Sequence, residues 1–437
     1  MKIGEPVTLC LRNARVIDPS LERDFYSDLL IMEGRIKECR PGISLGAELA
    51  AQVQSVDMKG KWVLPGLVDM HVHLREPGEE YKETIASGTR AAAVGGFAAV
   101  ACMPNTKPVN DSAAVTTYIL SRAKEEGSCF VFPVGAISRG LKGQDLAELG
   151  ELREAGAVAV TDDGRPVMNS LMMRRALEYA GTFDLTVISH AEDLNLAHGG
   201  VMNEGPVSTR LGLRGIPRAA EEVMVARDLL LAEMTQGKLH IAHVSTAGSV
   251  RLIREAKARG ISVTAETAPH YFTLTDDELM TFDTVFKVNP PLRRPDDVQA
   301  IKEGLADGTI DAIATDHAPH SVLEKDTEFD LAASGMIGLE SAVPLLLDLV
   351  REGVLSPLRA AAKASLNPAR ILGIPFGKLN VGAPAHVTVI DPDVSYTLDC
   401  NSFQSKSRNC PFHGRRMQGQ VFMTIVDGRM AFSRMSP

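Results

Sequence analysis

Short apolar runs and longer amphipathic stretches alternate through the middle of the chain. Eight apolar runs recur, at Val63–Met70, Phe97–Met103, Phe130–Ala136, Ala157–Thr161, Leu185–Ser189, Lys238–Val244, Ile261–Glu266 and Ile310–Thr315. Stretches with helical spacing lie between them or follow the last, near Tyr81–Val94, Ser112–Glu126, Ala147–Ala155, Met168–Ala180, Arg218–Met234, Ser249–Arg259, Asp296–Leu305 and Glu340–Arg351. Strands that alternate with helices in this way indicate a parallel sheet. Eight repeats favour a closed (β/α)8 barrel of the TIM type over an open sheet.

The two ends of the chain have a different pattern, of short strands and turns. Apolar runs bounded by turn residues occur at Val7–Val16, Asp28–Cys39, Val387–Ile390, Val421–Val426 and Met430–Phe432. The dipeptides Glu33-Gly34 and Asp427-Gly428 are typical of tight β-hairpin turns. About sixty residues at either end are too few for a core of their own. We therefore expect residues 1–60 and 376–437 to form one small, discontinuous β-sandwich domain beside a barrel that spans residues 61–375.

Polar side chains gather at the ends of the predicted barrel strands, where enzymes with this fold carry their chemistry. His71 and His73 end the first run, and side chains at i and i+2 share one face of a strand, so both imidazoles can bind one metal ion. Imidazoles or side-chain oxygens follow at later strand ends, from Asn105, Asp162, Asp163, His190, His243, Asp316 and, shortly afterwards, His320. By the same alternation His240 faces away from His243, and we expect it to be structural.

Buried carboxylates and imidazoles are costly unless they are paired or bound to a metal. Their recurrence at one end of the predicted barrel therefore favours a metal site over a set of isolated hydrogen bonds. The candidate ligands are His71, His73, His190, His243, Asp316 and either Asp162 or Asp163. Imidazole with carboxylate suits zinc, and six such ligands exceed what one catalytic zinc takes from protein. A carboxylate shared between two ions roughly 3.5–4 Å apart would use the whole set.

Composition limits the possible partners and the cellular setting. The 437 residues carry a formal net charge of −9, which argues against non-specific binding to nucleic acid or to an anionic membrane. No apolar run approaches the ~20 residues that span a bilayer, and the start of the chain lacks the plan of a signal peptide. The six cysteines are scattered without a CxxC pair, as expected for reduced thiols in a cytoplasmic protein.

Longer motifs follow one another in order along nearly the whole chain. They are Val63–Gly78 (VLPGLVDMHVHLREPG), Lys82–Ile85 (KETI), Gly95–Phe97 (GGF), Met103–Thr106 (MPNT), Thr161–Gly164 (TDDG), Lys287–Arg293 (KVNPPLR) and Thr315–His320 (TDHAPH). These motifs resemble those of the bacterial type I dihydroorotases, a family of the amidohydrolase superfamily. The resemblance implies a zinc-dependent hydrolase of cyclic amides that reversibly closes N-carbamoyl-L-aspartate to (S)-dihydroorotate with loss of water, a step of pyrimidine (UMP) biosynthesis.

The resemblance also implies a role for each matching residue. His71 and His73 would bind one zinc ion, His190 and His243 a second, and Asp163 would bridge the two. Asp316 would bind the first ion and move the proton. The residues implied to hold the substrate are His73, Arg75, Asn105, Asn289, His320, Ser334 and Gly335.

Three features of the chain differ from the wider superfamily or from the family pattern. Many amidohydrolases bridge their metals with a carbamylated lysine, but residues 157–164 contain no lysine. An aspartate bridge is typical of type I dihydroorotases, some of which bind one zinc, so we expect one or two ions and favour two. Val160 and Ser334 stand where the family usually has aromatic residues, and a ring contact at Ser334 is lost.

The polar segment 321–335 reads either as a mobile lid or as an ordinary solvated loop.

Two other functions compete with this interpretation. Hydantoinases, dihydropyrimidinases and allantoinases usually need the bridging lysine, and they lack the arginine after His-x-His. Arg75 can clamp a substrate carboxylate through paired charge-assisted hydrogen bonds, which an uncharged ring does not require. Some dihydroorotase-like chains only scaffold aspartate carbamoyltransferase, but those have lost metal ligands that this chain keeps. We expect a small-molecule substrate and a homodimer. Catalysis is compatible with an association with aspartate carbamoyltransferase, and the sequence does not decide whether that complex forms.

Overall fold

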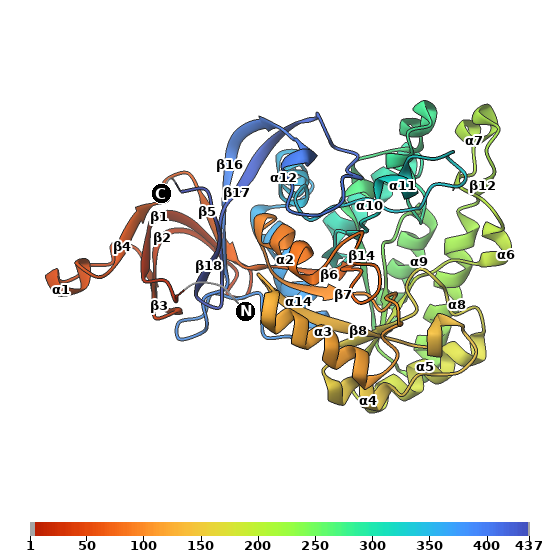
Figure 1. Cartoon of the computed structure of the whole chain (residues 1–437), viewed down its shortest axis with the longest axis horizontal. Coiled ribbons are helices and arrows are strands. Elements are labelled where there is room, and N and C mark those ends of the chain that lie inside the picture. The colour runs from red at the N-terminus through yellow and green to blue at the C-terminus, as the bar shows by residue number, and fades with distance from the viewer. Residues whose placement is uncertain (1–4, 436–437) are drawn as a thin grey trace.

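The computed structural model describes residues 5–435, and the middle of the chain forms a parallel β barrel (Figure 1). Its strands, in spatial order, are β6 (Leu67–Val72), β7 (Phe97–Cys102), β8 (Phe130–Ala136), β9 (Ala159–Thr161), β10 (Thr186–Ser189), β13 (Leu239–Ile241), β14 (Val263–Thr267) and β15 (Ala312–Ile313). A parallel bridge between Val72 and His317 joins the last strand region to the first. The barrel is thereby closed, which confirms the predicted (β/α)8 class.

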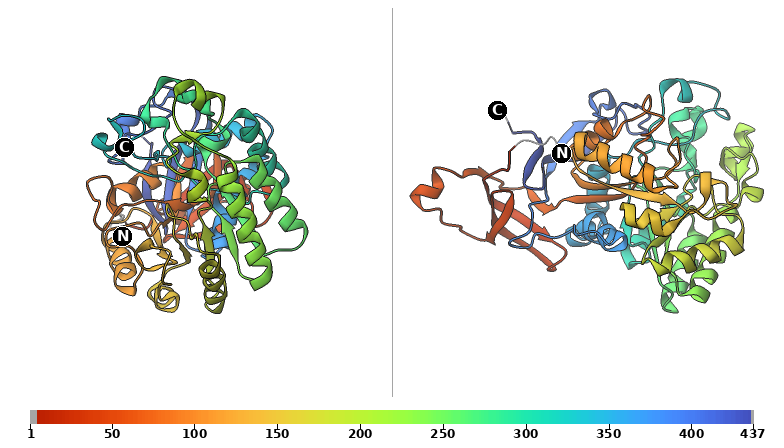
Figure 2. Two further views of the ribbon diagram at one scale, coloured as in Figure 1. Left: turned by 90° about the vertical axis from the view of Figure 1, so that its right-hand side faces the viewer. Right: turned by 60° about the horizontal axis from the view of Figure 1, so that its bottom comes forward.

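Helices surround the strands, as the view along the barrel in Figure 2 shows. The longer ones are α2 (Ile85–Val94), α3 (Ala113–Glu126), α4 (Leu149–Ala155), α5 (Ser170–Thr182), α8 (Ala219–Thr235), α9 (Ala247–Ala258), α10 (Pro295–Asp307) and α12 (Ala342–Arg351). Shorter elements are α1 (Ala47–Ala50), α6 (Leu194–Ala197), α7 (Pro206–Leu211), α11 (Val322–Lys325), α13 (Pro357–Ala361), α14 (Asn367–Leu372), β11 (Met202–Asn203) and β12 (Gly215–Ile216). Apolar strands covered by amphipathic helices on the outside produce the large barrel core.

Both ends of the chain join one further sheet, which lies at one side of the barrel (Figure 1). Its strand order is β18 (Arg429–Ser433), β17 (Arg416–Val426), β16 (Val387–Thr397), β5 (Trp62–Pro65), β1 (Leu9–Asp18), β2 (Arg23–Met32) and β3 (Arg35–Arg40), with β4 (Gln54–Asp57) paired to β1. Leu11, Ile31, Val389 and Ile425 belong to one apolar cluster, so strands from the two ends of the sequence share a core. Neither end alone would bury these side chains.

The two predicted hairpin turns touch each other in this terminal sheet. Glu33 and Gly34 have φ of 48° and 73°, and Asp427 and Gly428 have φ of 50° and 69°, as expected for tight turns between antiparallel strands. A Cβ atom added to Gly428 would lie 1.9 Å from the Cα atom of Gly34. Glycine is therefore required at this contact for space as well as for its backbone conformation.

The first predicted barrel strand is divided between the two sheets. Residues Trp62–Pro65 form β5 and pair with β1 and β16, whereas Leu67–Val72 form β6 of the barrel. The expectation of one continuous strand over Val63–Met70 is therefore wrong. Gly66 separates the two halves, and a Cβ atom there would lie 2.4 Å from the Cβ atom of Ala98. A continuous apolar run does not reveal a change of sheet, because both halves are equally buried.

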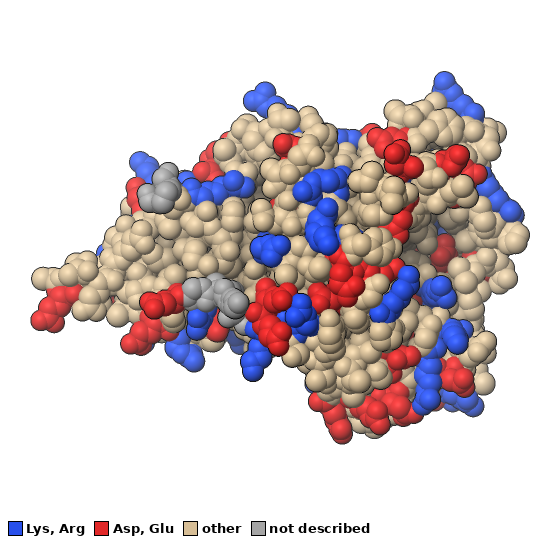
Figure 3. Space-filling view, in the orientation of Figure 1, with Lys and Arg blue, Asp and Glu red and all other residues tan. Residues whose placement is uncertain are grey.

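Two surface properties complete the description. Within the described residues, no helix has the length and apolarity needed to cross a membrane. Acidic and basic side chains are interspersed over the face drawn in Figure 3.

Candidate active site

The carboxyl ends of the barrel strands surround a cavity of about 280 Å³. Its lining consists of His73, Arg75, Asn105, Asp163, Gly164, His190, His243, Val288, Asn289, Asp316, Ala318, His320, Ser334 and Gly335. His71 is fully buried beside this lining. The structure therefore brings together all the site residues suggested by the resemblance, although they are spread along the sequence from His71 to Gly335.

Asp163 lies at the centre of four imidazoles. Its Oδ1 atom is 3.3 Å from His71 Nε2, 3.6 Å from His190 Nδ1 and 3.5 Å from His243 Nε2. Its Oδ2 atom is 3.5 Å from His73 Nε2. Most of these separations are long for direct hydrogen bonds, but they suit groups arranged around a shared cation. Burial opposes ionisation of Asp163, but the imidazoles around it outweigh burial and hold its pKa well below the ordinary value.

The donor atoms form two overlapping groups that fit a metal site. In each group the ligand atoms lie within 4.8 Å of one another, and the two groups are His71, His73 and Asp163, and Asp163, His190 and His243. His71 Nε2 and Asp163 Oδ1 are buried and lack a hydrogen-bond partner among the described residues. Buried polar atoms without a partner are costly. A bound cation would satisfy both atoms.

The structure gives the two neighbouring aspartates different partners. The residue pattern alone did not decide which of them belongs to the metal site. Asp162 accepts the backbone N–H of Ser138 at 2.9 Å and also the Ser138 hydroxyl. Its carboxylate therefore holds a loop, whereas the carboxylate of Asp163 lies among the imidazoles. Burial raises the pKa of Asp162 to about 6, in the direction opposite to that of Asp163.

Three of the imidazoles have a second partner on the side away from Asp163. His71 Nδ1 lies 2.7 Å from Glu266 Oε1, and His73 Nδ1 lies 2.9 Å from Asn105 Oδ1. His190 Nε2 is 3.5 Å from the carboxylate of Glu192. Such contacts fix the tautomer and the orientation of a metal-binding imidazole. The contact to Glu266 is the shortest of the three and joins two almost fully buried groups.

Glu266 and Glu192 were not among the predicted site residues. Glu266 ends the seventh apolar run, and Glu192 follows the fifth by three positions. Their place at strand ends is a usable indication, because other carboxylates at these strand ends, such as Asp163 and Asp316, line the cavity. What sequence could not show is which imidazole each one contacts.

Asp316 is a buried carboxylate at the end of the eighth strand region. Its Oδ1 atom is 3.2 Å from His73 Nε2 and 3.6 Å from His71 Nε2. Burial opposes ionisation, but the hydrogen bond with His73 and the surrounding imidazoles lower the pKa of Asp316 below its ordinary value. The group is therefore an anion that can accept a proton from a molecule in the cavity.

Three lining residues have backbone conformations that are unusual for side chains other than glycine. The φ angles of Arg75, His243 and Asp316 are 62°, 34° and 49°. Such conformations cost of order 1–3 kcal/mol each and persist where the surrounding structure enforces them. They lie at the ends of strands, where the chain turns to aim these side chains at the cavity.

Arg75 gives the cavity a positive wall. Its guanidinium is buried, and its Nε donates to the carbonyl of Pro319 at 3.1 Å. His320 lies beside it, with 3.4 Å between Nη2 and Nε2, and places its Nε2 2.9 Å from the Ser334 carbonyl. Burial together with the charge of Arg75 lowers the pKa of His320 to about 3, so His320 is neutral. A neutral imidazole and a guanidinium therefore lie side by side.

The remaining predicted substrate residues come from two loops. Asn289 Nδ2 donates to Glu192 at 3.1 Å. Ser334 and Gly335 end the segment 321–335, which the ammonium group of Lys325 ties together through the Ala333 and Gly335 carbonyls at 2.8 and 3.0 Å.

Two other histidines near the strand ends are outside the lining. His240 faces away from the cavity, with Nδ1 2.7 Å from the Thr264 hydroxyl, in line with strand alternation. His317 Nδ1 accepts the backbone N–H of Gly338 at 3.2 Å, and its Nε2 is 3.4 Å from Glu83. Both rings are thus engaged in contacts within the protein.

Comparisons with known proteins identify similar sequences and folds. A family model described as dihydro-orotase-like matches residues 60–249. A dihydroorotase of Syntrophobacter fumaroxidans is 65% identical over 438 residues, with 100% of both chains covered. A dihydroorotase of Geobacter metallireducens is 57% identical, with 98% of this chain and 100% of the relative covered.

Solved structures extend the comparison to the fold. An L-hydantoinase from Arthrobacter aurescens superposes with a TM-score of 0.87 at 24% identity, covering 98% of this chain and 97% of that one. A dihydropyrimidinase from Brevibacillus agri has a TM-score of 0.84 at 22% identity, with 98% and 95% covered. At such identities the likeness concerns the barrel and its terminal sheet rather than the reaction.

Proposed function

Because the chain belongs to the dihydroorotase family, we propose that its active site interconverts N-carbamoyl-L-aspartate and (S)-dihydroorotate in pyrimidine biosynthesis, with water lost on ring closure. The observation that carries the proposal is the buried guanidinium of Arg75 in the wall of the cavity that also holds the His and Asp cluster. Dihydroorotate combines a cyclic amide with a carboxylate that does not react. The cavity offers a partner for each part.

The proposed cofactor is zinc, with two ions favoured. His71, His73 and Asp316 would hold one ion, His190 and His243 the other, and Asp163 would lie between them. When bound, zinc would lower the pKa of a water molecule and polarise the ring carbonyl. Imidazole nitrogens and carboxylate oxygens are ligands that suit this ion.

Asp316 is the proposed proton carrier. In ring opening, a water molecule adds to the ring amide carbonyl, and the Asp316 carboxylate accepts its proton. Asp316 then delivers that proton to the ring nitrogen as the carbon–nitrogen bond breaks, and ring closure reverses these steps. The ionised state of Asp316 and its place in the cavity lining support this role.

Arg75 is proposed to bind the substrate carboxylate. A guanidinium binds a carboxylate through paired charge-assisted hydrogen bonds, which are strong in a buried site. Asn105 holds His73 through its carbonyl oxygen, which leaves its amide nitrogen as a donor for substrate. His320, Asn289, Ser334 and Gly335 complete the proposed binding surface.

The hydantoinase type of reaction is the second candidate, because hydantoinase and dihydropyrimidinase structures share the fold. Arg75 argues against it, since a ring without a carboxylate would leave a buried guanidinium unpaired. A chain that only scaffolds another enzyme would not need the intact cluster around Asp163.

One assay separates these possibilities. The purified protein is given dihydroorotate, dihydrouracil and allantoin in parallel, and its zinc content is measured. We expect turnover of dihydroorotate alone, with about two zinc ions per chain if both groups around Asp163 are filled. Turnover of dihydrouracil without dihydroorotate would refute the substrate assignment.

The pH dependence of the equilibrium provides a second check. N-carbamoyl-L-aspartate has two carboxylates and dihydroorotate has one, so ring closure consumes a proton. Lower pH should therefore favour the ring and higher pH the open form. Product ratios that are independent of pH would contradict the assigned reaction.

The proposal also includes a cytoplasmic homodimer that can associate with aspartate carbamoyltransferase. Light scattering of the purified chain measures its oligomeric state. Adding the transferase and repeating the measurement tests the association.

A further inference from the structure

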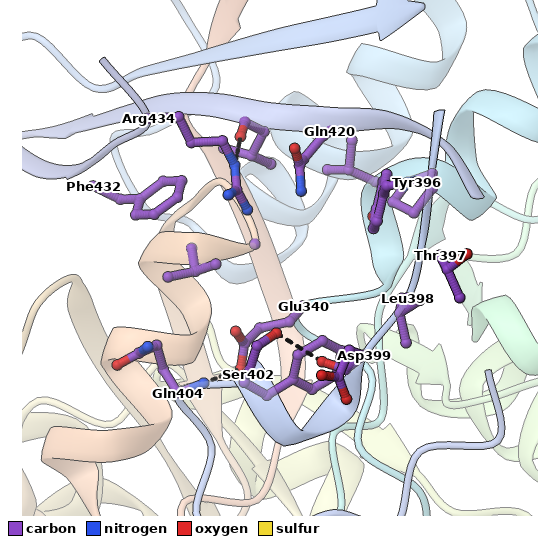
Figure 4. Close-up of a pocket in the computed structure, with 16 residues that line it drawn as sticks. Glu340, Tyr396, Thr397, Leu398, Asp399, Ser402, Gln404, Gln420, Phe432 and Arg434 are labelled. Carbon is purple, nitrogen blue, oxygen red and sulfur yellow. Dashed lines mark hydrogen bonds between the residues drawn. The ribbon is translucent and has the colours of Figure 1, made fainter. Parts of the chain in front are cut away.

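The connection between β16 and β17 leaves the terminal sheet and crosses onto the barrel. We call residues 398–415 the strap. Glu340 accepts the backbone N–H groups of Gln404 and Ser405 at 2.8 and 3.1 Å, beside a cavity of about 270 Å³ between sheet and barrel (Figure 4). Glu83, in the loop after β6, accepts the Ser405 hydroxyl and the backbone N–H of Lys406. Two carboxylates of the barrel thus hold the strap.

Beyond these anchors the strap reaches the loop that lines the active site. Asn409 Nδ2 donates to the carbonyls of Ala318 and Gly335, at 2.9 and 3.1 Å. Its Oδ1 accepts the backbone N–H of His320 at 3.4 Å. Ala318, His320 and Gly335 line the active-site cavity, whereas Asn409 is buried behind them. Both amide hydrogens and the carbonyl oxygen of this side chain are therefore used on one loop.

The position of Gly335 is sensitive to these contacts. A Cβ atom at Gly335 would lie 2.8 Å from the Cβ of Ala318 and 2.9 Å from Nε2 of His320. The Gly335 carbonyl also accepts the ammonium group of Lys325 at 3.0 Å, so two donors hold it from different elements. The space between Gly335 and the imidazole of His320 thus has no room for a side chain, so we expect a displacement of this backbone to affect the ring.

We propose that Asn409, carried by the strap from the terminal sheet, is a positioning residue that sets the backbone from Ala318 to Gly335 for substrate binding. The inference rests on the proposed function, which makes His320 and Gly335 contact the substrate. Asn409 itself touches neither the substrate nor the His and Asp cluster. The terminal sheet is then part of the working site, because the strap runs between two of its strands.

The test replaces Asn409 with an isosteric residue that cannot donate. In Asn409→Asp, a carboxylate oxygen replaces the donor and faces the carbonyls of Ala318 and Gly335, which it repels. Asn401→Asp is the matched control, because it makes the same change of charge at an exposed position of the strap. Hydrogen exchange of the whole chain and steady-state kinetics with dihydroorotate are measured for both variants and the parent protein.

For Asn409→Asp we expect faster exchange confined to residues 318–335. Loss of these buried hydrogen bonds should raise KM about 10- to 100-fold. The value of kcat should change less than about threefold, because the groups that react are not displaced. The control should match the parent protein in both measurements.

Each other result decides against the proposal or against the proposed function. If Asn409→Asp matches the control, or if exchange rises throughout the chain while kcat and zinc content fall, Asn409 has no positioning role. If this variant does not fold, Asn409→Ser retains one donor and should give an intermediate rise in KM; an unchanged KM overturns the inference. If the parent protein does not turn over dihydroorotate, the proposed function fails, and local exchange still shows whether Asn409 orders the loop.

Discussion

Removing the charge of Glu266 should weaken metal binding at the proposed site, although it replaces none of the proposed ligands. Its carboxylate lies 2.7 Å from His71 Nδ1, and both side chains are at most 2% exposed. At this depth the carboxylate is ionised, because the imidazoles of His240 and His71 outweigh burial and lower the pKa of Glu266 to about 2. It therefore holds the His71 ring with Nε2 towards Asp163 and makes that nitrogen a better donor to a cation.

The size of the effect follows from the geometry. Loss of such an outer partner typically reduces metal affinity 10- to 100-fold, or about 1.4–2.7 kcal/mol. Glu266→Gln retains an oxygen that can accept the Nδ1 proton but loses the charge, so we expect a reduction of about tenfold. Glu266→Leu loses both and should approach 100-fold. Glu192→Gln is the matched control, because its carboxylate is 3.5 Å from His190 and should contribute less.

The assay titrates metal-free protein with zinc against a chromogenic chelator and yields affinities without any turnover. Circular dichroism of the metal-free variants checks that they are folded. The reasoning would be refuted if both Glu266 variants bound zinc as tightly as the parent protein. A loss in Glu192→Gln as large as in Glu266→Gln would also contradict it, since the two contacts differ in length.

Three further predictions concern the proton carrier, the substrate carboxylate and the junction with the terminal sheet. Asp316→Asn should lower kcat by roughly 10²- to 10⁴-fold, the usual contribution of general acid–base catalysis, in an assay with zinc supplied in excess; near-normal turnover would exclude it as proton carrier. Arg75→Met should raise KM for dihydroorotate by roughly 30-fold or more, the effect of about 2 kcal/mol from a buried charge pair, and an unchanged KM would remove Arg75 from the substrate site. Burial raises the pKa of Glu340 from 4.5 to about 7, so the folded state binds the proton more tightly than the unfolded state. The contribution of Glu340 to the free energy of unfolding is therefore fully present below pH 4.5 and is lost as the pH rises through 7. The Glu340→Gln variant lacks this pH dependence. The free energy of unfolding of the variant minus that of the parent protein should therefore increase by up to about 3 kcal/mol between pH 4.5 and 8. Thermal midpoints of both proteins across that range provide the measurement, and a difference that does not vary with pH would contradict the shift.

Much of the architecture follows from the order of residue types along the chain. Burial of a strand on both faces requires a continuous apolar run, and a helix on the outside requires a spacing near 3.6 residues. Eight repeats of this pair can therefore be recognised from the sequence alone. His71 and His73 could be assigned to one face because side chains of a strand alternate with a period of two.

The choice between Asp162 and Asp163 shows where local pattern ends. Adjacent strand residues point to opposite faces, but the phase depends on where the strand stops and turns. Ser138, in the loop that follows β8, donates to the carboxylate of Asp162, and Asp163 is left to the imidazoles. The same limit applies to Gly66, where an uninterrupted apolar run passes from one sheet to another.

By itself the sequence determined the repeating strands and helices, the residue types available for chemistry and the end of the barrel at which they gather. These properties depend on neighbours a few positions apart, so a single chain records them. The tertiary structure alone decided that Glu266 contacts His71. It also decided that Asn409 contacts Ala318 and Gly335, which lie 91 and 74 positions earlier in the chain. Such contacts arise because closing the barrel and joining the two chain ends bring distant backbone together, and no local periodicity encodes which atoms then meet.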